Sequence, residues 1–310
     1  MVISLSRGEN MAGGVKPNWG VPWWWLDRSL PDRSPGERLE ALRARGGRHL
    51  LLGPPRLEGC RWPQVVEGLH QGPLRALAVQ AFSPPLAGGS TAGGMGFAAT
   101  GTEEGEESLA RLGAARELAK LARTPLVVLF PGRLDLGPHW AGDLARHSRD
   151  LPELLARVEE VRARQRDRAL DRVCRRLHAA LELTGLPRLC LRNGFDLAGL
   201  DRVEDLAAIQ EDLGRARICF WLDPAAAAFR EEAGEGSLGA LLDRLGSTAA
   251  ALSLGDGRPG ESGQIPGTGL VDFRLVGDYL RRPGGVLPWT VEILPEYGLE
   301  GIEAALGEVT

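Results

Sequence analysis

Three observations on the sequence predict a closed (β/α)8 barrel, the TIM-barrel class of α/β folds. Short apolar runs bounded by Gly or Pro recur eight times along the 310 residues, with amphipathic stretches between them. Several runs are apolar almost throughout, as strands buried on both faces must be. Strands that alternate with helices pair in parallel through right-handed crossovers. Eight such units need roughly 250 residues or more, and residues 17–307 supply them.

The eight predicted strands are the apolar runs themselves, most of which are too short for helices. In chain order they are Trp19–Trp25, His49–Leu52, Leu74–Phe82, Leu126–Phe130, Arg188–Leu191, Ile218–Leu222, Ala249–Leu254 and Trp289–Leu294. The competing arrangement is a doubly wound open sheet. The sequence disfavours it, because no Gly-rich dinucleotide fingerprint follows the first strand.

The helices between these strands are predicted from start signals and apolar spacing. Ser34 begins a capping box with Glu37, and we expect Asp201 and Ser237 to cap two further helices. The acidic run Glu103–Glu107 is expected at a helix N-terminus, where carboxylates complement the dipole. The predicted segments are Arg38–Arg45, Ser108–Arg123, Leu151–Leu183, Leu206–Leu213, Leu238–Leu245, Asp272–Leu280 and Leu299–Leu306.

The composition excludes several classes of protein. Hydrophobic residues make up 43% of the chain and charged residues 25%, so the chain is not wholly disordered. No run of 18 apolar residues occurs, and we therefore expect no membrane span. The formal net charge of −4 argues against a nucleic-acid partner, whose binding needs clustered cations. We expect residues 1–16 to be a flexible lead-in and residues 17–310 to be a single barrel domain.

The cysteine pattern favours a reduced, cytoplasmic protein. The four cysteines are widely spaced and form no CxxC pair. Cys190 and Cys219 lie inside apolar runs, where a free buried thiol is expected. The N-terminus carries no long apolar segment of the kind found in a secretory signal, so we expect no secretion. An oligomer is compatible with the sequence.

The carboxyl ends of the strands are where a barrel of this class places its site. Strands four to six end in Phe130-Pro131-Gly132-Arg133, Leu191-Arg192-Asn193-Gly194 and Trp221-Leu222-Asp223-Pro224. Strand seven ends in Ser253-Leu254-Gly255-Asp256 and leads to Gln264-Ile265-Pro266-Gly267-Thr268-Gly269, and strand eight carries Val291-Glu292-Ile293. We therefore expect Arg192, Asp223, Ser253 and Glu292 to surround one mouth of the barrel.

Over about residues 108–294 the chain resembles the sugar phosphate isomerase/epimerase family, the xylose isomerase-like TIM barrels. The resemblance rests on Ala115-Arg116-Glu117-Leu118-Ala119 leading to Val127-Val128-Leu129-Phe130-Pro131-Gly132, on Leu222-Asp223, on Pro266-Gly267-Thr268-Gly269 before Val271-Asp272-Phe273, and on Val291-Glu292. The order and spacing of these pieces carry the resemblance, because each one alone is weak.

The resemblance implies isomerase or epimerase chemistry on a small sugar, with a divalent metal such as zinc or manganese. The family holds this metal with a Glu on strand five, an Asp on strand six, a His on strand seven and a Glu on strand eight. Asp223 and Glu292 match two of these ligands, whereas Arg192 and Ser253 stand at the other two positions. Two carboxylates are too few protein ligands for a catalytic metal, which usually has three or more. We therefore expect no cofactor.

Three interpretations of the residues at the strand ends remain open. In the first, Asp223 and Glu292 form salt bridges with Arg192 that fill the vacated metal position. In the second, the planar guanidinium of Arg192 binds a phosphate or carboxylate through two hydrogen bonds. Metal catalysis with rearranged ligands is the third. The candidate catalytic residues are Glu292 and Asp223, and the candidate ligand-binding residues are Arg192, Arg133, Trp24, Asp256 and Gln264.

Other segments have both a functional and a structural interpretation. Alternation along the first strand would turn Trp24 away from its neighbours, so that an indole stacks on a sugar or packs in the core. The Gly-rich segment 87–101 is interpreted either as a mobile lid over the site or as a loose insertion without a role in binding. His139 is a loop histidine that adds to an anion site or lies in solvent. The arginines of Arg157–Arg176 are expected on a solvated helix face with ion pairs.

Three functions follow from these residues. The first is an isomerase or epimerase that acts on or binds a small sugar or polyol-type ligand. The second is a catalytically degenerate barrel that serves as a ligand-binding or protein-interaction scaffold. The third is a phosphodiester-cleaving enzyme like endonuclease IV, which is disfavoured because its His-rich metal cluster is absent from the sequence.

Overall fold

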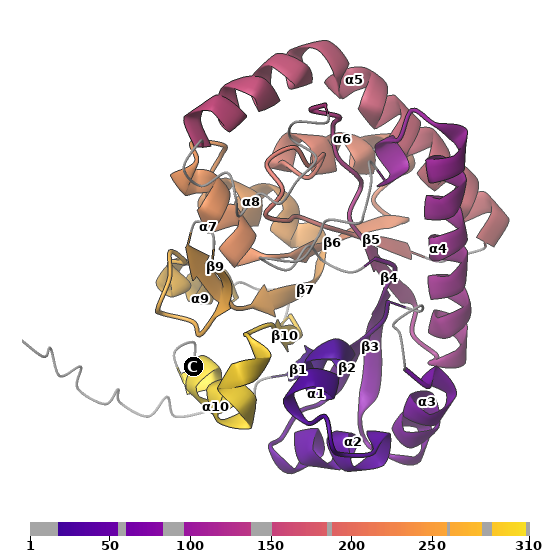
Figure 1. Cartoon of the computed structure of the whole chain (residues 1–310), viewed down its shortest axis with the longest axis vertical. Helices are drawn as coiled ribbons and strands as arrows, with labels where there is room; N and C mark the ends of the chain where they lie inside the picture. The colour runs from indigo at the N-terminus through magenta and orange to yellow at the C-terminus, as the bar shows by residue number, and fades with distance from the viewer. Residues whose placement is uncertain are drawn as a thin grey trace, which may run out of the picture.

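Eight parallel strands close into a barrel that is surrounded by helices (Figure 1). This computed structural model describes residues 18–54, 60–82, 96–137, 151–184, 188–258, 261–280 and 287–307. The barrel strands are β1 (Trp19–Pro22), β2 (His49–Leu52), β3 (Arg75–Gln80), β4 (Leu126–Leu129), β5 (Arg188–Arg192), β6 (Ile218–Leu222), β7 (Ala249–Leu254) and β10 (Trp289–Val291). They neighbour one another in chain order, and β1 pairs with β10 to close the barrel. The predicted (β/α)8 class is confirmed.

Alternate residues of each strand face the inside of the barrel or the surrounding helices. The inside is filled by a cluster of Leu51, Ala78, Leu126, Val128, Cys190, Cys219, Trp221 and Ala251. The intervening strand residues join a larger cluster that includes the apolar side chains of the helices. Burial on both faces explains why the strands are apolar almost throughout. On β5, Cys190 faces inward, so Arg192 two residues later faces the same side.

The helices mostly agree with their predicted positions. They are α1 (Trp23–Ser29), α2 (Pro35–Ala44), α3 (Trp62–Gln71), α4 (Thr102–Leu121), α5 (Leu151–Thr184), α6 (Val203–Leu213), α7 (Pro224–Glu232), α8 (Leu238–Leu245), α9 (Phe273–Leu280) and α10 (Gly298–Gly307). Ser34 forms the predicted capping box with Glu37, and Ser237 caps α8. The sequence analysis missed α3, α7 and the antiparallel pair β8 (Asp256–Arg258) and β9 (Glu261–Gln264). None of the described helices is both long and apolar enough to cross a membrane.

The first strand is shorter than predicted. β1 ends at Pro22, which has no N–H to continue the ladder, and Trp23 begins helix α1. The prediction that the three tryptophans alternate across a strand is therefore wrong. All three indoles are buried, Trp24 included, and Arg28 lies over the Trp24 ring. The helical turn allows three large rings to pack into the apolar core together.

The predicted cap of α6 is also wrong. Its N-cap residue is Arg202, and no side chain caps the helix. The carboxylate of Asp201 instead accepts hydrogen bonds from the N–H of Gly194 at 2.6 Å and from Arg230 at 2.5 Å. A guanidinium is a stronger donor than a backbone N–H, so the tertiary partner prevails over the local cap.

The arginines of α5 do more than form a solvated face. Exposed ion pairs occur as predicted, for example between Arg164 and Glu160. Arg172 and Arg176, however, donate to backbone carbonyls in and next to the short 3-10 helix η1 (Gly96–Ala98). Helix α5 thus anchors the end of the Gly-rich segment, whose residues 87–95 lie outside the described part of the chain.

Candidate functional site

Four predicted strand-end residues come together in one hydrogen-bonded group. Arg192 ends β5, Asp223 follows β6, Ser253 lies on β7 and Glu292 follows β10. These four strands are adjacent in the barrel, in the order β10–β7–β6–β5. Inward positions at their carboxyl ends therefore meet at the same mouth. We call these four residues the strand-end cluster.

Arg192 is the centre of the strand-end cluster. Its Nη1 donates to Oε1 of Glu292 and its Nη2 donates to Oε2, both at 2.9 Å. Nη2 also donates to Oδ2 of Asp223 at 2.7 Å. Two-pronged pairing of this kind fixes the orientation of both partners. The guanidinium carbon lies 5.8 Å from the ring centroid of Phe130, so the cation also lies against an aromatic face.

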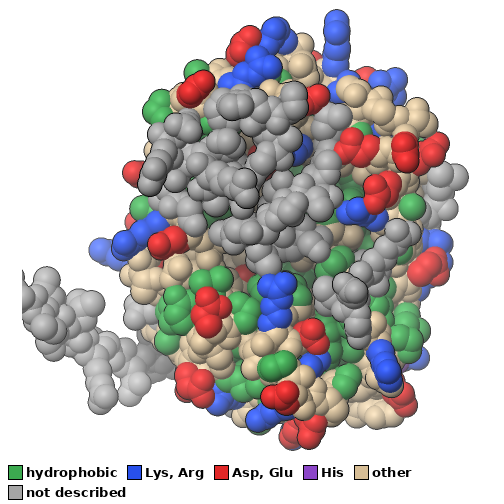
Figure 2. Space-filling view, in the orientation of Figure 1, with side chains coloured by type: hydrophobic (Ala, Val, Ile, Leu, Met, Phe, Trp, Pro, Cys, Tyr) green, Lys and Arg blue, Asp and Glu red, His purple; other side chains and the backbone are tan. Residues whose placement is uncertain are grey.

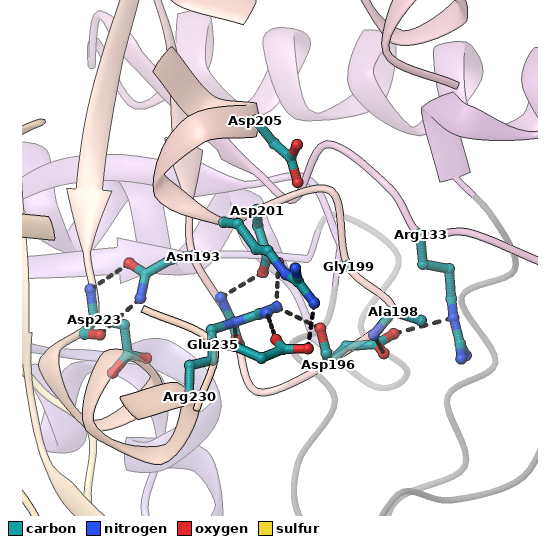
Figure 3. Close-up of polar contacts among 12 residues, drawn as sticks. Arg133, Asn193, Asp196, Ala198, Gly199, Asp201, Asp205, Asp223, Arg230 and Glu235 are labelled. Carbon is teal, nitrogen blue, oxygen red and sulfur yellow. Dashed lines mark hydrogen bonds and ion pairs between the residues drawn. The ribbon is translucent and has the colours of Figure 1, made fainter. Parts of the chain in front are cut away.

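Asp223 is fixed on both sides by its neighbours. Its Oδ1 accepts a hydrogen bond from the N–H of Ala226 at 3.2 Å and so caps α7. The side chain of Asn193 brackets the Asp223 backbone, because it accepts from the N–H and donates to the C=O, both at 2.8 Å (Figure 3). Asn193 thereby ties the end of β5 to the end of β6.

Ser253 connects the strand-end cluster to the barrel interior. Its hydroxyl donates to Oε1 of Glu292 at 2.9 Å and accepts from Nε1 of Trp221 at 2.9 Å. Trp221 is fully buried and belongs to the interior cluster. One hydroxyl therefore links Glu292 to a buried indole.

Burial and charge balance set the electrostatics of the cluster. The exposed fraction of the side chain is 4% for Arg192, 7% for Asp223 and 11% for Glu292. Burial alone would lower the pKa of Arg192, but the charges of Glu292 and Asp223 raise that pKa above its ordinary value. One guanidinium faces two carboxylates, and each of the four carboxylate oxygens accepts at least one hydrogen bond.

Arg133, the second predicted ligand-binding arginine, belongs to a different network. Its Nε lies 3.1 Å from Oδ2 of Asp196, in the loop after β5 (Figure 3). Arg230 on α7 donates to the Asp196 carbonyl and to the carboxylates of Asp201 and Glu235. Burial raises the pKa of Asp201 to about 7, against the lowering effect of Arg230. Arg133 therefore contributes to the network that stabilises the β5–α6 loop.

The remaining predicted ligand-binding residues have protein partners. Asp256 is fully buried, and its carboxylate accepts from the backbone N–H groups of Gly257, Gly267, Gly269 and Val271 at 2.8–3.1 Å. Asp256 thus shapes the segment that follows β7. Gln264 accepts from the hydroxyl of Tyr297 at 2.5 Å, and Trp24 lies on α1. His139 lies outside the described residues.

Comparison with known proteins identifies the fold. No family model and no curated protein matches the sequence. A xylose isomerase domain protein from Planctomyces limnophilus superposes with a TM-score of 0.64 at 15% identity, over 94% of this chain and 95% of that chain. The apo form of the 3-keto-D-glucoside 4-epimerase YcjR from E. coli gives 0.63 at 12% identity, over 95% and 99%. An IolI protein with a bound zinc atom gives 0.63 at 15%, over 94% and 95%. The chain has the fold of these xylose isomerase-like TIM barrels.

The donor set of this xylose isomerase-like barrel does not fit a resident divalent metal. In the described part of the chain, no group of three or more His, Cys, Asp or Glu side chains could hold one. Arg192 and Ser253 occupy two of the four positions at which the resemblance implies ligands. A guanidinium remains charged and cannot become a ligand. The Nε of Arg192 is buried without a hydrogen-bond partner among the described residues, and as a donor it suits an oxygen atom rather than a cation.

Sequence reasoning missed three residues that build the site of this xylose isomerase-like barrel. Asn193 directly follows Arg192, and a polar residue at a strand end is a usable signal. Trp221 lies two residues before Asp223, so strand alternation places both on the inward face. Arg230 carried no signal, because the helix that presents it was not predicted and its partners lie in a loop.

Proposed function

We propose that this barrel binds a small sugar or polyol-type ligand at its carboxyl-end mouth, as a sugar isomerase/epimerase-like protein. The observation that carries the proposal is the strand-end cluster, which brings a guanidinium, two carboxylates and a hydroxyl together from four adjacent strands. Polar groups fixed by neighbours are what orient a hydroxyl-rich ligand in a concave site. The 3-keto-D-glucoside 4-epimerase, whose fold is similar, supports the same class of ligand.

Glu292 is the residue that we propose to contact the ligand first. Its side chain is the most exposed of the three charged ones, at 11%. Arg192 and Ser253 hold its carboxylate in one orientation, as a proton acceptor in an isomerisation requires. Asp223 is more buried and caps a helix. We propose that it assists by balancing the charge of Arg192.

The other candidate residues would take secondary roles. Arg133 and Gln264 are partly exposed and remain our candidates for direct ligand contacts. Trp24 and Asp256 are buried, so we propose that they shape the mouth rather than contact the ligand. The Nε–H of Arg192 is buried and has no hydrogen-bond partner among the described residues, so we propose that Arg192 orients Glu292 through its terminal nitrogens.

The proposed ligand is a small molecule, and the proposed site works without a resident divalent metal. We propose no nucleic-acid partner, because described acidic and basic side chains are interspersed on the face shown in Figure 2 and the formal net charge is −4. The four cysteines are free. Free thiols favour a reducing compartment such as the cytoplasm.

One observation favours a second candidate function, a barrel that binds its ligand without turnover. Every carboxylate oxygen of Asp223 and Glu292 already accepts a hydrogen bond. In a two-pronged ion pair the carboxylate oxygens are engaged by protein donors, which leaves them less accessible to a ligand. The same cluster thus suits a ligand-binding scaffold.

Two measurements test the proposed function and separate it from the alternative. Isothermal titration of purified protein with a panel of neutral ketoses, aldoses and polyols measures binding, with Glu292→Gln as the site variant and Glu117→Gln, at an exposed position on α4, as the matched control. Proton NMR in D2O then measures exchange of the carbon-bound hydrogen next to the carbonyl group. Binding with exchange supports the isomerase/epimerase function, and binding without exchange supports the scaffold. No binding by any sugar contradicts both.

A further inference from the structure

The surroundings of the Arg192 guanidinium resemble those of a bound cation. Three carboxylate oxygens, one from Asp223 and two from Glu292, lie 2.7–2.9 Å from its terminal nitrogens. The hydroxyl of Ser253 orients one of these oxygens. Oxygen atoms of this kind, completed by water, are also the ligands that magnesium and manganese prefer.

We infer that Arg192 is a built-in cation that fills a latent divalent-cation site formed by Asp223 and Glu292. The inference concerns the cation and stands apart from the sugar ligand proposed above. Arg192, at the end of β5, then supplies the positive charge that a metal would bring to the mouth. The two carboxylates are then fixed by a covalently attached group that cannot dissociate.

Three features of the site fit a guanidinium better than a metal ion. The two-pronged contact with Glu292 matches the planar fork of arginine. The ring of Phe130 offers a π face to the cation and no ligand atom. A guanidinium stays protonated at every relevant pH, so its positive charge is permanent.

A purely structural ion pair makes a different prediction. If the three side chains only hold strands together, removing the guanidinium weakens the fold and leaves no affinity for other cations. If they form a latent cation site, removing it exposes three convergent oxygens near the mouth. A free cation of suitable size then binds there.

The test uses Arg192→Ala with manganese and methylguanidinium as separate probes. Bound manganese is counted by electron paramagnetic resonance, and the melting temperature is measured with and without each probe. We expect Arg192→Ala to bind one manganese ion at least about 100-fold more tightly than wild type does, and to regain melting temperature with either probe. The wild-type melting temperature should not change. The double variant Arg192→Ala/Glu292→Gln should lose most of the gained affinity.

Two further variants serve as a control and as a second test of the inference. Arg133→Ala removes a partly buried arginine that pairs with a single carboxylate, so it should gain no manganese affinity. Arg192→Gln retains side-chain volume and is measured in the same way if the alanine variant does not fold. If both Arg192 variants bind manganese no better than wild type, or if Arg133→Ala gains as much, Arg192 is a structural ion pair and the inference is wrong.

Discussion

Arg192 and Glu292 face each other across the barrel mouth, and each terminal nitrogen of the guanidinium donates to a different oxygen of the carboxylate at 2.9 Å. The two residues are 100 positions apart in the sequence and lie on β5 and just after β10. Because the pair is buried, neither group can turn toward water without losing its partner. The contact therefore fixes the charge pattern that any ligand meets.

Our first prediction concerns how the two carboxylates share one guanidinium. Either Asp223→Asn or Glu292→Gln leaves Arg192 with one charged partner, so each should lower the free energy of unfolding by about 1–3 kcal/mol. The double variant leaves a buried charge without compensation and should cost about 0.5–3 kcal/mol more than the sum of the two. Urea denaturation of the four proteins measures the coupling. Additivity within about 0.5 kcal/mol would show that the carboxylates do not share the charge.

A second prediction concerns His49 and pH. Burial lowers the pKa of His49 from 6.5 to about 4, and its Nε2 lies 2.9 Å from the carbonyl of Trp289. Between these pH values the unfolded chain binds a proton that the folded chain does not, so stability falls as pH decreases from about 6.5 to 4. The loss should reach about 3 kcal/mol.

The contribution of His49 is isolated by comparison of variants. His49→Gln can still donate to the Trp289 carbonyl but cannot take up a proton, so its unfolding free energy should decrease less on acidification than that of wild type. His178→Gln, at an exposed position, should retain the wild-type pH dependence. Equal acid sensitivity of His49→Gln and wild type would refute the assignment.

A third prediction concerns the segment after β7. Four backbone N–H groups donate to the carboxylate of Asp256. In Asp256→Asn one of the two acceptor oxygens becomes an amide donor, so two N–H groups lose their partner at a cost of about 2–4 kcal/mol. Chemical denaturation measures the loss, and hydrogen exchange should locate it in residues 256–271. Protection unchanged in that segment would contradict this role.

A fourth prediction concerns the three tryptophans of α1. Because Trp23, Trp24 and Trp25 are all buried, each substitution by alanine should cost about 3–5 kcal/mol. Trp24→Phe should cost much less and leave sugar binding unchanged, since an aromatic ring still fills the space. If Trp24→Phe abolishes sugar binding without loss of stability, the indole contacts the ligand after all.

The fold was largely predictable because barrel strands are buried on both faces. That burial produces eight apolar runs, and seven of them agree with the observed strands to within a few residues. The exception, Trp19–Trp25, is equally apolar as a strand or as a buried helix, so periodicity could not place its end. Helix α7 was missed because it begins directly after β6, although Asp223 at its N-cap and Pro224 at its first position are helix-start signals.

The site was predictable only as far as topology determines it. Strand order alone brings Arg192, Asp223, Ser253 and Glu292 together, and this convergence is what the structure contains. The sequence could not decide between an ion pair, an anion site and rearranged metal ligands, because that choice depends on side-chain geometry. The Arg230 network depends on loop conformation, which has no periodic signal.

The most direct test of our central claim, that Arg192 replaces a metal at the mouth, is a calorimetric titration with zinc. We expect purified wild-type protein to show no stoichiometric binding, since a fixed guanidinium a few ångströms away repels a cation by several kcal/mol, at order of magnitude, in a partly buried site. Arg192→Glu/Ser253→His supplies the two ligand types implied by the resemblance and should bind one zinc ion tightly. Stoichiometric, submicromolar zinc binding by the wild-type protein would contradict the claim.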